Sequence, residues 1–354
     1  MTLQDSKNNM DPLLRNRRSL PDHQEDRSEH LWWNANADLI ERLWAHDSSV
    51  RLALRAEYLG KARGFLTKNV SSDDIIFELG SGSGWVGRVL VEGTKNCLLG
   101  IDLSEAQVEI SKKNAEAEGL SMQCTYVRAN LSDSGSHINE HQTISGLLIH
   151  AILHHLTWSE IDQIFIDAVR LGPEAKLFAY EPVFFRQLHS KKKPSIVGRL
   201  SRLLAVFSVL CVLFLMRLFG LVTRAARDQN LVTRLDQVSR EAAANQWVLS
   251  PKEVVFDHKE LLDTLEKNYI VKRSYLCNYS DMSAATTASI LHENSRQRCV
   301  YLKFFIPALR ILDRWLVSSG AIYELCSGNP RWRLINRFFP RYCFWGVECL
   351  PKNV

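Results

Sequence analysis

Short apolar runs alternate with amphipathic helical patterns between residues 71 and 182, and this alternation constrains the fold more than any other feature of the chain. The helical patterns expected there are Gly84–Glu92, Glu105–Glu118 and Trp158–Leu171. A repeated strand–helix–strand order predicts an α/β fold in which helices cover both faces of a parallel sheet. The runs that we predict to be strands are Ile75–Leu79, Cys97–Ile101, Gln123–Arg128, Ser145–Ile149 and Lys176–Tyr180.

The segments on either side of this region extend the predicted organisation. Residues 31–70 carry apolar side chains at helical spacing and are predicted to form an N-terminal helical layer. Residues 1–30 mix both charge signs and lack the apolar core of a signal peptide, so we expect a mobile tail and a cytoplasmic protein. Residues 250–277 predict a helix and a strand, and residues 342–354 predict a closing strand and the C-terminus. These last two strands are Tyr269–Leu276 and Cys343–Leu350.

Two segments of different composition interrupt the predicted core, at residues 183–249 and 278–341. Within the first, residues 186–227 hold nine basic and no acidic residues, and they enclose fourteen uncharged residues, Leu203–Met216. This uncharged stretch is shorter than the about 20 residues that a spanning helix needs. We therefore expect a helix that lies on or dips into a membrane, with a spanning helix or a helix buried in the fold as alternatives.

The second insertion contains two amphipathic patterns. The first begins at Pro307 and has a polar side that includes Arg310, Asp313 and Arg314. The second begins at Asn329 and places arginines four residues apart on one face, at Arg333, Arg337 and Arg341. Both patterns predict basic helices.

The net charge of +5 conceals an uneven distribution along the chain. Residues 182–227 contribute +9 and residues 296–354 contribute +7, which leaves −11 for the remainder. An acidic body with two basic, apolar segments indicates an anionic membrane surface as partner, through residues 186–227 and 303–341. The eight cysteines are scattered without a Cys-x-x-Cys pair, so we expect neither a disulfide framework nor a metal site.

A glycine-rich motif follows the first predicted strand. Glu78 ends the strand, and Gly80, Gly82 and Gly84 lead into a helix whose free N–H groups suit a ligand. Asp102, at the end of the next strand, is placed to accept both hydroxyls of a ribose. The series from Gly82 also matches a dinucleotide fingerprint formally, but it begins two residues late, and Glu78 would oppose a pyrophosphate and favour a cationic ligand.

These motifs resemble those of the class I S-adenosylmethionine-dependent methyltransferases. The family's first motif, acidic-x-Gly-x-Gly-x-Gly, is matched at residues 78–84, and Asp102 matches its second-strand carboxylate. Asn130 stands where the family usually has an Asp near the adenine. The fourth strand ends in the family's Leu-His-His-Leu pattern, and the fifth in Tyr180-Glu181-Pro182. The resemblance implies a Rossmann-like fold with a seven-stranded sheet, here carrying the two basic, apolar insertions.

The resemblance further implies S-adenosylmethionine as the cofactor and methyl transfer by in-line displacement as the reaction. For a hydroxyl acceptor a base must take the proton, and His154 and His155 are the two candidates. Four aromatic residues either pack in the core or shape an acceptor pocket: Trp32, Trp33, Tyr58 and Trp85. The cofactor residues that the resemblance implies are Glu78, Gly80, Ser81, Gly82, Gly84, Asp102, Leu103, Asn130, Leu131 and His150.

The acceptor class follows from what the sequence lacks and what the insertions carry. After the fourth strand there is neither an Asn/Asp-Pro-Pro-aromatic motif nor a Pro-Cys pair, which disfavours methylation of nucleic-acid bases, and we expect no nucleic acid as partner. We expect O-methylation of a lipid-linked acceptor, such as a glycolipid, an isoprenoid or a polyprenyl-linked saccharide, on the cytoplasmic face of a membrane. The alternatives are a cytosolic methyltransferase of a small soluble metabolite and a non-catalytic cofactor-binding scaffold.

Overall fold

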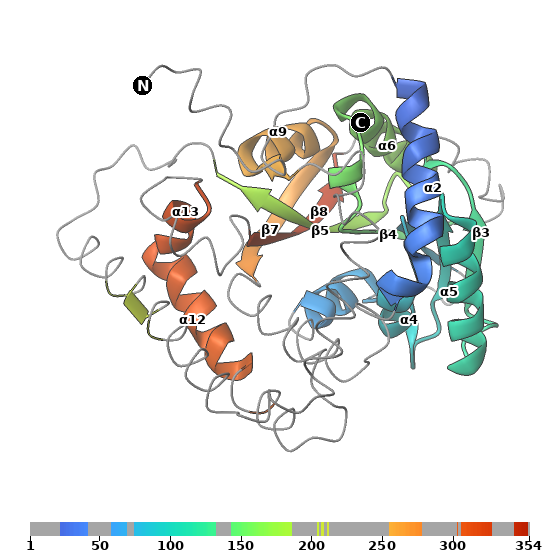
Figure 1. Cartoon of the computed structure of the whole chain (residues 1–354), viewed down its shortest axis with the longest axis horizontal. Coiled ribbons are helices and arrows are strands. Elements are labelled where there is room, and N and C mark those ends of the chain that lie inside the picture. The colour runs from blue at the N-terminus through green and yellow to red at the C-terminus, as the bar shows by residue number, and fades with distance from the viewer. Residues whose placement is uncertain are drawn as a thin grey trace.

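A computed structural model describes residues 22–41, 58–68, 74–131, 143–185, 255–277, 306–327 and 343–352, together with positions 204, 207, 208, 211 and 303 (Figure 1). Most of the insertion at residues 183–249 lies outside the described residues, as does the pattern that begins at Asn329. No helix in the described part of the chain combines the length and the apolar character needed to cross a membrane.

The described strands form one sheet with the order β3-β2-β1-β4-β5-β8-β7, and β6 pairs with β5 outside this path. β1 to β5 run parallel, whereas β8 runs antiparallel to both β5 and β7. The predicted Rossmann-like α/β fold is therefore confirmed, with seven strands along the main path. The strands are β1 (Ile75–Leu79), β2 (Cys97–Asp102), β3 (Cys124–Arg128), β4 (Ile144–His150), β5 (Lys176–Phe184), β6 (Phe256–Asp257), β7 (Tyr269–Cys277) and β8 (Cys343–Pro351).

Two details of the sheet differ from the prediction. β5 continues to Phe184, four residues beyond the predicted end at Tyr180, because it pairs with β8 as far as Val183. β6 was not predicted, since its two residues are too few to show a strand periodicity.

Helices cover both faces of the sheet, and their start signals are local. Thr157 begins α6 (Trp158–Leu171) with a reciprocal cap to Glu160, and the Ser104 side chain caps α5 (Glu105–Ala117). One face of the sheet packs against α6, α9 (His258–Asn268), α12 (Ile306–Ser319) and α13 (Ala321–Leu325). The other packs against α4 (Trp85–Val91), α5 and the helix at 58–66.

The N-terminal boundary differs from the prediction. Helix α2 (Asp22–Ile40) begins inside residues 1–30, which we expected to form a mobile tail. Polar and charged residues dominate its first turns, so no apolar periodicity marks the start, while the acidic residues near that end suit the helix dipole. Figure 1 shows α2 lying across the ends of the strands, beside α5.

Helix α12 corrects the expected amphipathic pattern of the second insertion. Its apolar residues Leu309, Leu312 and Leu316 are buried in the core on the sheet, so this side is not free to contact a membrane. Asp313, assigned to the polar side, is also buried. A helical wheel cannot detect this, because the depth at which a helix packs is set by its neighbours rather than by its own sequence.

Candidate functional site

The polar residues singled out in the sequence converge on one edge of the sheet, where the parallel strands β1 to β4 end. Glu78 lies near the end of β1, Asp102 ends β2, Asn130 follows β3, and His150 ends β4. Open α/β sheets bind ligands outside the carboxyl ends of their strands, so this edge is the candidate site. The remaining predicted residues follow the same strand ends: Gly80, Ser81, Gly82, Gly84, Leu103, Leu131, His154 and His155.

The three glycines after β1 all have positive φ, of 64° at Gly80, 52° at Gly82 and 70° at Gly84. A Cβ added at Gly80 would collide with the Ile152 side chain, and one at Gly84 would lie 2.6 Å from the Tyr126 ring. At Gly82 an added Cβ would meet nothing within 4 Å. The loop is therefore packed against protein at its two ends and borders open space at its centre.

The carbonyl groups of this loop are held by side chains from three other elements. Ser111 Oγ donates to the Gly82 carbonyl at 2.7 Å, Arg88 Nη1 to the Ser83 carbonyl at 2.6 Å, and Tyr126 Oη to the Gly84 carbonyl at 3.2 Å. Since the carbonyls are engaged inside the fold, the loop backbone is fixed before any ligand binds.

Asp102 connects the glycine loop to the end of β2. Its Oδ2 accepts the backbone N–H of Gly82 and its Oδ1 that of Ser104, each at 2.8 Å. Burial raises the pKa of Asp102, and these two hydrogen bonds oppose the rise. Each carboxylate oxygen keeps a further lone pair, which is what two ribose hydroxyls require.

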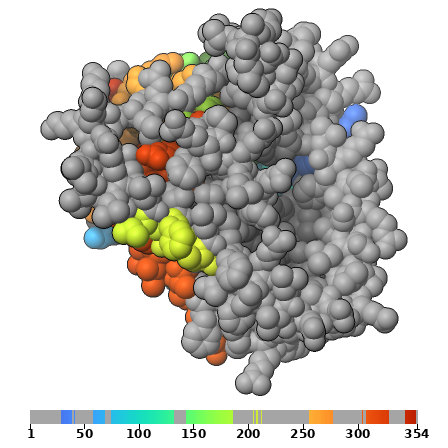
Figure 2. Space-filling model, turned by 60° about the vertical axis from the view of Figure 1, so that its left-hand side comes forward, coloured from blue at the N-terminus to red at the C-terminus, as the bar shows by residue number. Residues whose placement is uncertain are grey.

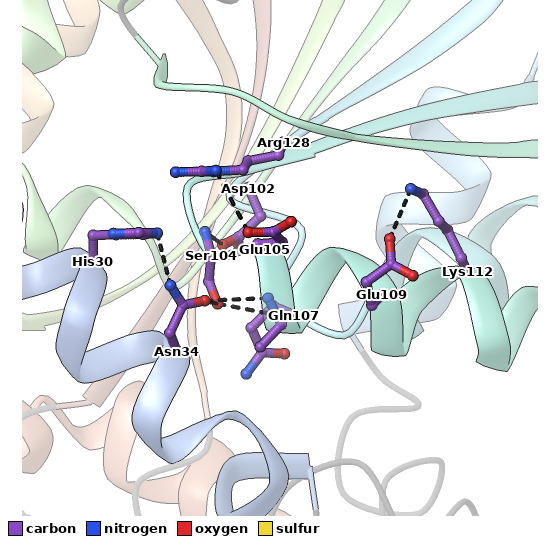
Figure 3. A network of polar contacts seen from close by, with 10 residues as sticks. His30, Asn34, Asp102, Ser104, Glu105, Gln107, Glu109, Lys112 and Arg128 are labelled. Carbon is purple, nitrogen blue, oxygen red and sulfur yellow. Dashed lines mark hydrogen bonds and ion pairs between the residues drawn. The ribbon is translucent and has the colours of Figure 1, made fainter.

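Helix α2 is attached to the site through Asn34, which the sequence did not reveal. Asn34 Oδ1 accepts Ser104 Oγ at 2.7 Å and the N–H of Ala106 at 3.1 Å (Figure 3). Asn34 Nδ2 lies 2.7 Å from His30 Nε2 in the same helix. The Asn34 side chain therefore joins α2 to Ser104, whose backbone N–H donates to Asp102. The partners are about seventy positions apart in the chain, so no local motif signals the contact.

Glu78 lies behind the glycine loop rather than in the open. Its Oε1 accepts the N–H of Gly87 at 3.2 Å. Burial raises the pKa of Glu78 to about 8, although the neighbouring Arg88 opposes the rise. At neutral pH the carboxyl group is therefore mostly protonated. The negative charge that would repel the pyrophosphate of a dinucleotide is therefore largely absent. Only the position of the glycines, which begin two residues before the formal fingerprint, still disfavours a dinucleotide.

The residues present fit a polar cofactor such as S-adenosylmethionine. Within the described part of the chain, Glu78 Oε2, Ser81 Oγ and both polar atoms of the Gln107 side chain are buried without a hydrogen-bond partner. Unsatisfied buried groups are costly, and two of these residues, Glu78 and Ser81, belong to the glycine motif, so this motif is a place where a ligand can supply partners. The open space at Gly82 and the lone pairs of Asp102 belong to the same region.

His150 is enclosed by aromatic rings on one face of the sheet. Its Nε2 lies 2.9 Å from Tyr58 Oη, and its ring stacks on Tyr180 with centroids 5.4 Å apart. Trp85 meets it edge-on. Tyr58 and Trp85 are both buried in the core cluster of this face, so core packing describes them better than an exposed acceptor pocket.

His154 and His155 lie in the short 3₁₀ helix η4 (Leu153–His155), and each has a carboxylate partner. His154 Nδ1 lies 3.0 Å from Glu181 Oε2, and His155 Nδ1 lies 3.1 Å from Glu29 Oε1. Trp33 Nε1 donates to the same Glu29 oxygen at 2.8 Å. The two imidazole centroids are 4.1 Å apart. Sequence reasoning missed both carboxylates, although the Glu-Pro ending of β5 was a usable signal for Glu181.

Comparisons with known proteins agree with this geometry. Residues 76–172 match a family described as a methyltransferase domain. Two similar solved structures each have a TM-score of 0.52. Geranyl diphosphate C-methyltransferase from Streptomyces coelicolor A3(2), solved with Mg²⁺, geranyl diphosphate and S-adenosyl-L-homocysteine, is 10% identical and aligns over 94% of this chain and 100% of its own. Mycolic acid cyclopropane synthase CmaA1, solved with S-adenosylhomocysteine and CTAB, is 12% identical over 94% and 99%. No curated protein sequence matches the chain.

Proposed function

We propose that this chain, an S-adenosylmethionine-dependent methyltransferase with a class I fold, methylates a hydroxyl group of a lipid-linked acceptor at an anionic membrane surface. The observation that carries the proposal is that both insertions expose large apolar side chains, and that the sequence of the first insertion is strongly basic.

Exposed large apolar side chains occur in both insertions. Leu204 and Phe207 of the first insertion are 50% and 62% exposed, and Ile311 on α12 is 67% exposed. Figure 2 shows the described positions 204, 207, 208 and 211 beside α12, and Figure 1 agrees. Large apolar side chains gathered on a surface indicate a binding site for a protein or a membrane.

The charge around these residues favours a membrane. Residues 186–227, which include Leu204 and Phe207, carry nine basic and no acidic side chains. Each basic residue near an anionic lipid surface contributes about 1 kcal/mol of binding free energy, which adds to the insertion of the apolar side chains. An anionic membrane is therefore the occupant that we propose, on the cytoplasmic side.

The cofactor site that we propose consists of the glycine loop with Glu78 and Ser81, the end of β2 with Asp102 and Leu103, the Asn130–Leu131 turn, and His150. S-adenosylmethionine supplies a methyl group on a positively charged sulfur, from which the acceptor oxygen takes it in line. His154 or His155 would take the hydroxyl proton, because a neutral imidazole near pH 7 can accept it.

The molecules named with the two similar structures support an apolar acceptor. One was solved with geranyl diphosphate, and the other is named as a mycolic acid cyclopropane synthase, so folds of this class accommodate isoprenoid and long-chain molecules. At about a tenth sequence identity they support the class of acceptor only as an analogy of fold.

Flotation with lipid vesicles tests the membrane proposal. The protein should float with phosphatidylglycerol vesicles, and replacing Lys191, Lys192 and Lys193 by alanine, or Phe207→Ser, should reduce the floated fraction several-fold. The matched control is Met122→Ser, since Met122 is 95% exposed but lies at the opposite, amino edge of the strands. Equal flotation of all variants, or none by the wild type, would support a soluble acceptor instead.

A further inference from the structure

We propose that Glu181 is a positioning residue: it fixes the protonation and orientation of His154, which makes His154 rather than His155 the base. The inference rests on the proposed transfer to a hydroxyl group, because that transfer releases the hydroxyl proton and a base must take it. Glu181 lies in β5 opposite Trp345 of β8, and its side chain is 0% exposed.

The Glu181 carboxylate accepts two backbone N–H groups from the turn after β4 and contacts the ring of His154 there. Its Oε1 accepts the backbone N–H groups of Ile152 at 2.8 Å and of Leu153 at 2.9 Å, and its Oε2 lies 3.0 Å from His154 Nδ1. A carboxylate that accepts two backbone N–H groups through one oxygen presents its other oxygen as a further acceptor, which places the hydrogen on His154 Nδ1. The lone pair of His154 is then on Nε2, where it can take a proton.

The same turn is strained, and Glu181 helps to hold it. Ala151 has a φ of 52°, and within the described residues it is the only non-glycine with a positive φ. Its N–H donates to the Tyr180 carbonyl at 2.8 Å, and the next two N–H groups go to Glu181. A non-glycine residue in this region is strained and persists only where its surroundings enforce it.

The strained turn also packs against the glycine loop. The Ile152 side chain occupies the space in which a Cβ on Gly80 would stand. The Glu181 carboxylate thus contacts the ring of His154 and the backbone N–H of Ile152. The side chain of Ile152 packs directly on the loop that we assign to the cofactor. The buried Glu181 carboxylate therefore contacts both the proposed base and the turn that packs against the proposed cofactor site.

The proton and electrons balance in this arrangement. The acceptor hydroxyl gives its proton to His154 Nε2, and its oxygen uses the released electron pair to bond the methyl carbon. The sulfur keeps the electrons of the broken carbon–sulfur bond and leaves as S-adenosylhomocysteine. The resulting imidazolium is stabilised by the Glu181 carboxylate until the proton passes to water.

The pair formed by His155 and Glu29 differs in its support. Glu29 comes from α2 and not from the sheet, and its Oε1 is shared between His155 and Trp33 Nε1. Glu29→Gln therefore offers a matched comparison for Glu181→Gln, since each replaces one carboxylate beside one histidine.

Nitrogen-15 NMR of histidine-labelled protein reads the tautomers without any acceptor. We expect His154 to carry its hydrogen on Nδ1 in the wild type and on Nε2 in Glu181→Gln, because the new amide N–H₂ donates to Nδ1. Glu29→Gln should change only His155. An Nε2–H tautomer of His154 in the wild type, or an unchanged tautomer in Glu181→Gln, would overturn the proposal.

Methyl transfer to a membrane lipid extract gives the second readout. Glu181→Gln should lower the transfer rate by about 10²- to 10⁴-fold, the range that a positioned general base typically contributes. Calorimetry with S-adenosylhomocysteine should show cofactor affinity within two-fold of the wild type. A rate loss in Glu29→Gln but not in Glu181→Gln, or a parallel loss of cofactor binding in Glu181→Gln, would contradict the assignment.

Two outcomes separate this proposal from the proposed function. If Glu181→Gln does not fold, Glu181→Asp, which keeps the charge, should fold, preserve the Nδ1–H tautomer and lower the rate less. If the wild type transfers no methyl group to lipid, the proposed acceptor is wrong, whereas the NMR result still decides whether Glu181 sets the tautomer of His154.

Discussion

The backbone N–H of Gly82 donates a 2.8 Å hydrogen bond to Asp102 Oδ2, so the glycine loop after β1 is tied to the carboxyl end of β2. The same carboxylate accepts the N–H of Ser104, whose side chain bonds Asn34 on α2. Three segments that are distant in the sequence therefore meet at one carboxylate. This carboxylate both shapes the loop and offers its remaining lone pairs to a ribose.

Asp102→Asn should weaken cofactor binding about 10- to 100-fold, because the amide keeps one acceptor and loses the charge that strengthens each hydrogen bond. Isothermal calorimetry with S-adenosylhomocysteine measures the effect. Glu109→Gln on the exposed side of α5 is the control and should leave the affinity unchanged. Equal affinities of Asp102→Asn and the wild type would remove Asp102 from the cofactor site.

Gly80→Ala should mainly lower the stability of the protein, whereas Gly82→Ala should mainly lower its affinity for the cofactor. Both place a methyl group at a positive φ, which costs about 1–2 kcal/mol. At Gly80 the methyl group also collides with Ile152, so the free energy of unfolding should fall by a further about 1–3 kcal/mol. At Gly82 the methyl group enters open space, so stability should fall less, but cofactor affinity should fall more. Urea denaturation and calorimetry on both variants decide this.

The raised pKa of Glu78 predicts how stability changes with pH in the absence of cofactor. Between the ordinary value of 4.5 and about 8, the unfolded chain releases this proton while the native protein keeps it. The free energy of unfolding therefore falls as pH rises through this window, by at most about 5 kcal/mol. Glu78→Gln cannot ionise, so its advantage over the wild type should grow from pH 5 to 8 and then level off. Parallel stability curves would show that Glu78 is not protonated in the native protein.

Asn34→Ala should loosen helix α2. The change removes the acceptor of Ser104 Oγ and of the Ala106 N–H, at a cost of about 1–3 kcal/mol. Amide exchange in residues 29–38 should accelerate about ten-fold or more, measured by mass spectrometry, while exchange in α6 serves as the internal reference. Unchanged exchange in α2 would mean that other contacts hold the helix.

The sequence predicted those parts of the fold that local patterns determine. β1 and α6 begin and end where the periodicity placed them, because buried strands and capped helices carry their own signals. The glycine motif and Asp102 were found for the same reason, since a backbone with positive φ and a strand-end carboxylate are encoded within a few residues.

The remaining site residues depend on contacts between distant segments. Glu29 reaches His155 across 126 positions, and Asn34 reaches Ser104 across 70, and neither contact leaves a local pattern. The burial of Asp313 and the raised pKa of Glu78 likewise follow from packing in three dimensions. Sequence reasoning identified the histidines correctly as strand-end residues but could not assign their carboxylate partners.

Methyl transfer from S-adenosylmethionine with a tritiated methyl group tests the proposed function most directly. The purified protein is incubated with lipids extracted from the source cells in phosphatidylglycerol vesicles, and in parallel with the water-soluble extract. Label should enter the organic phase, in a product whose new methyl group is bonded to oxygen. Label found only in water-soluble products, or only on carbon, would contradict O-methylation of a lipid-linked acceptor.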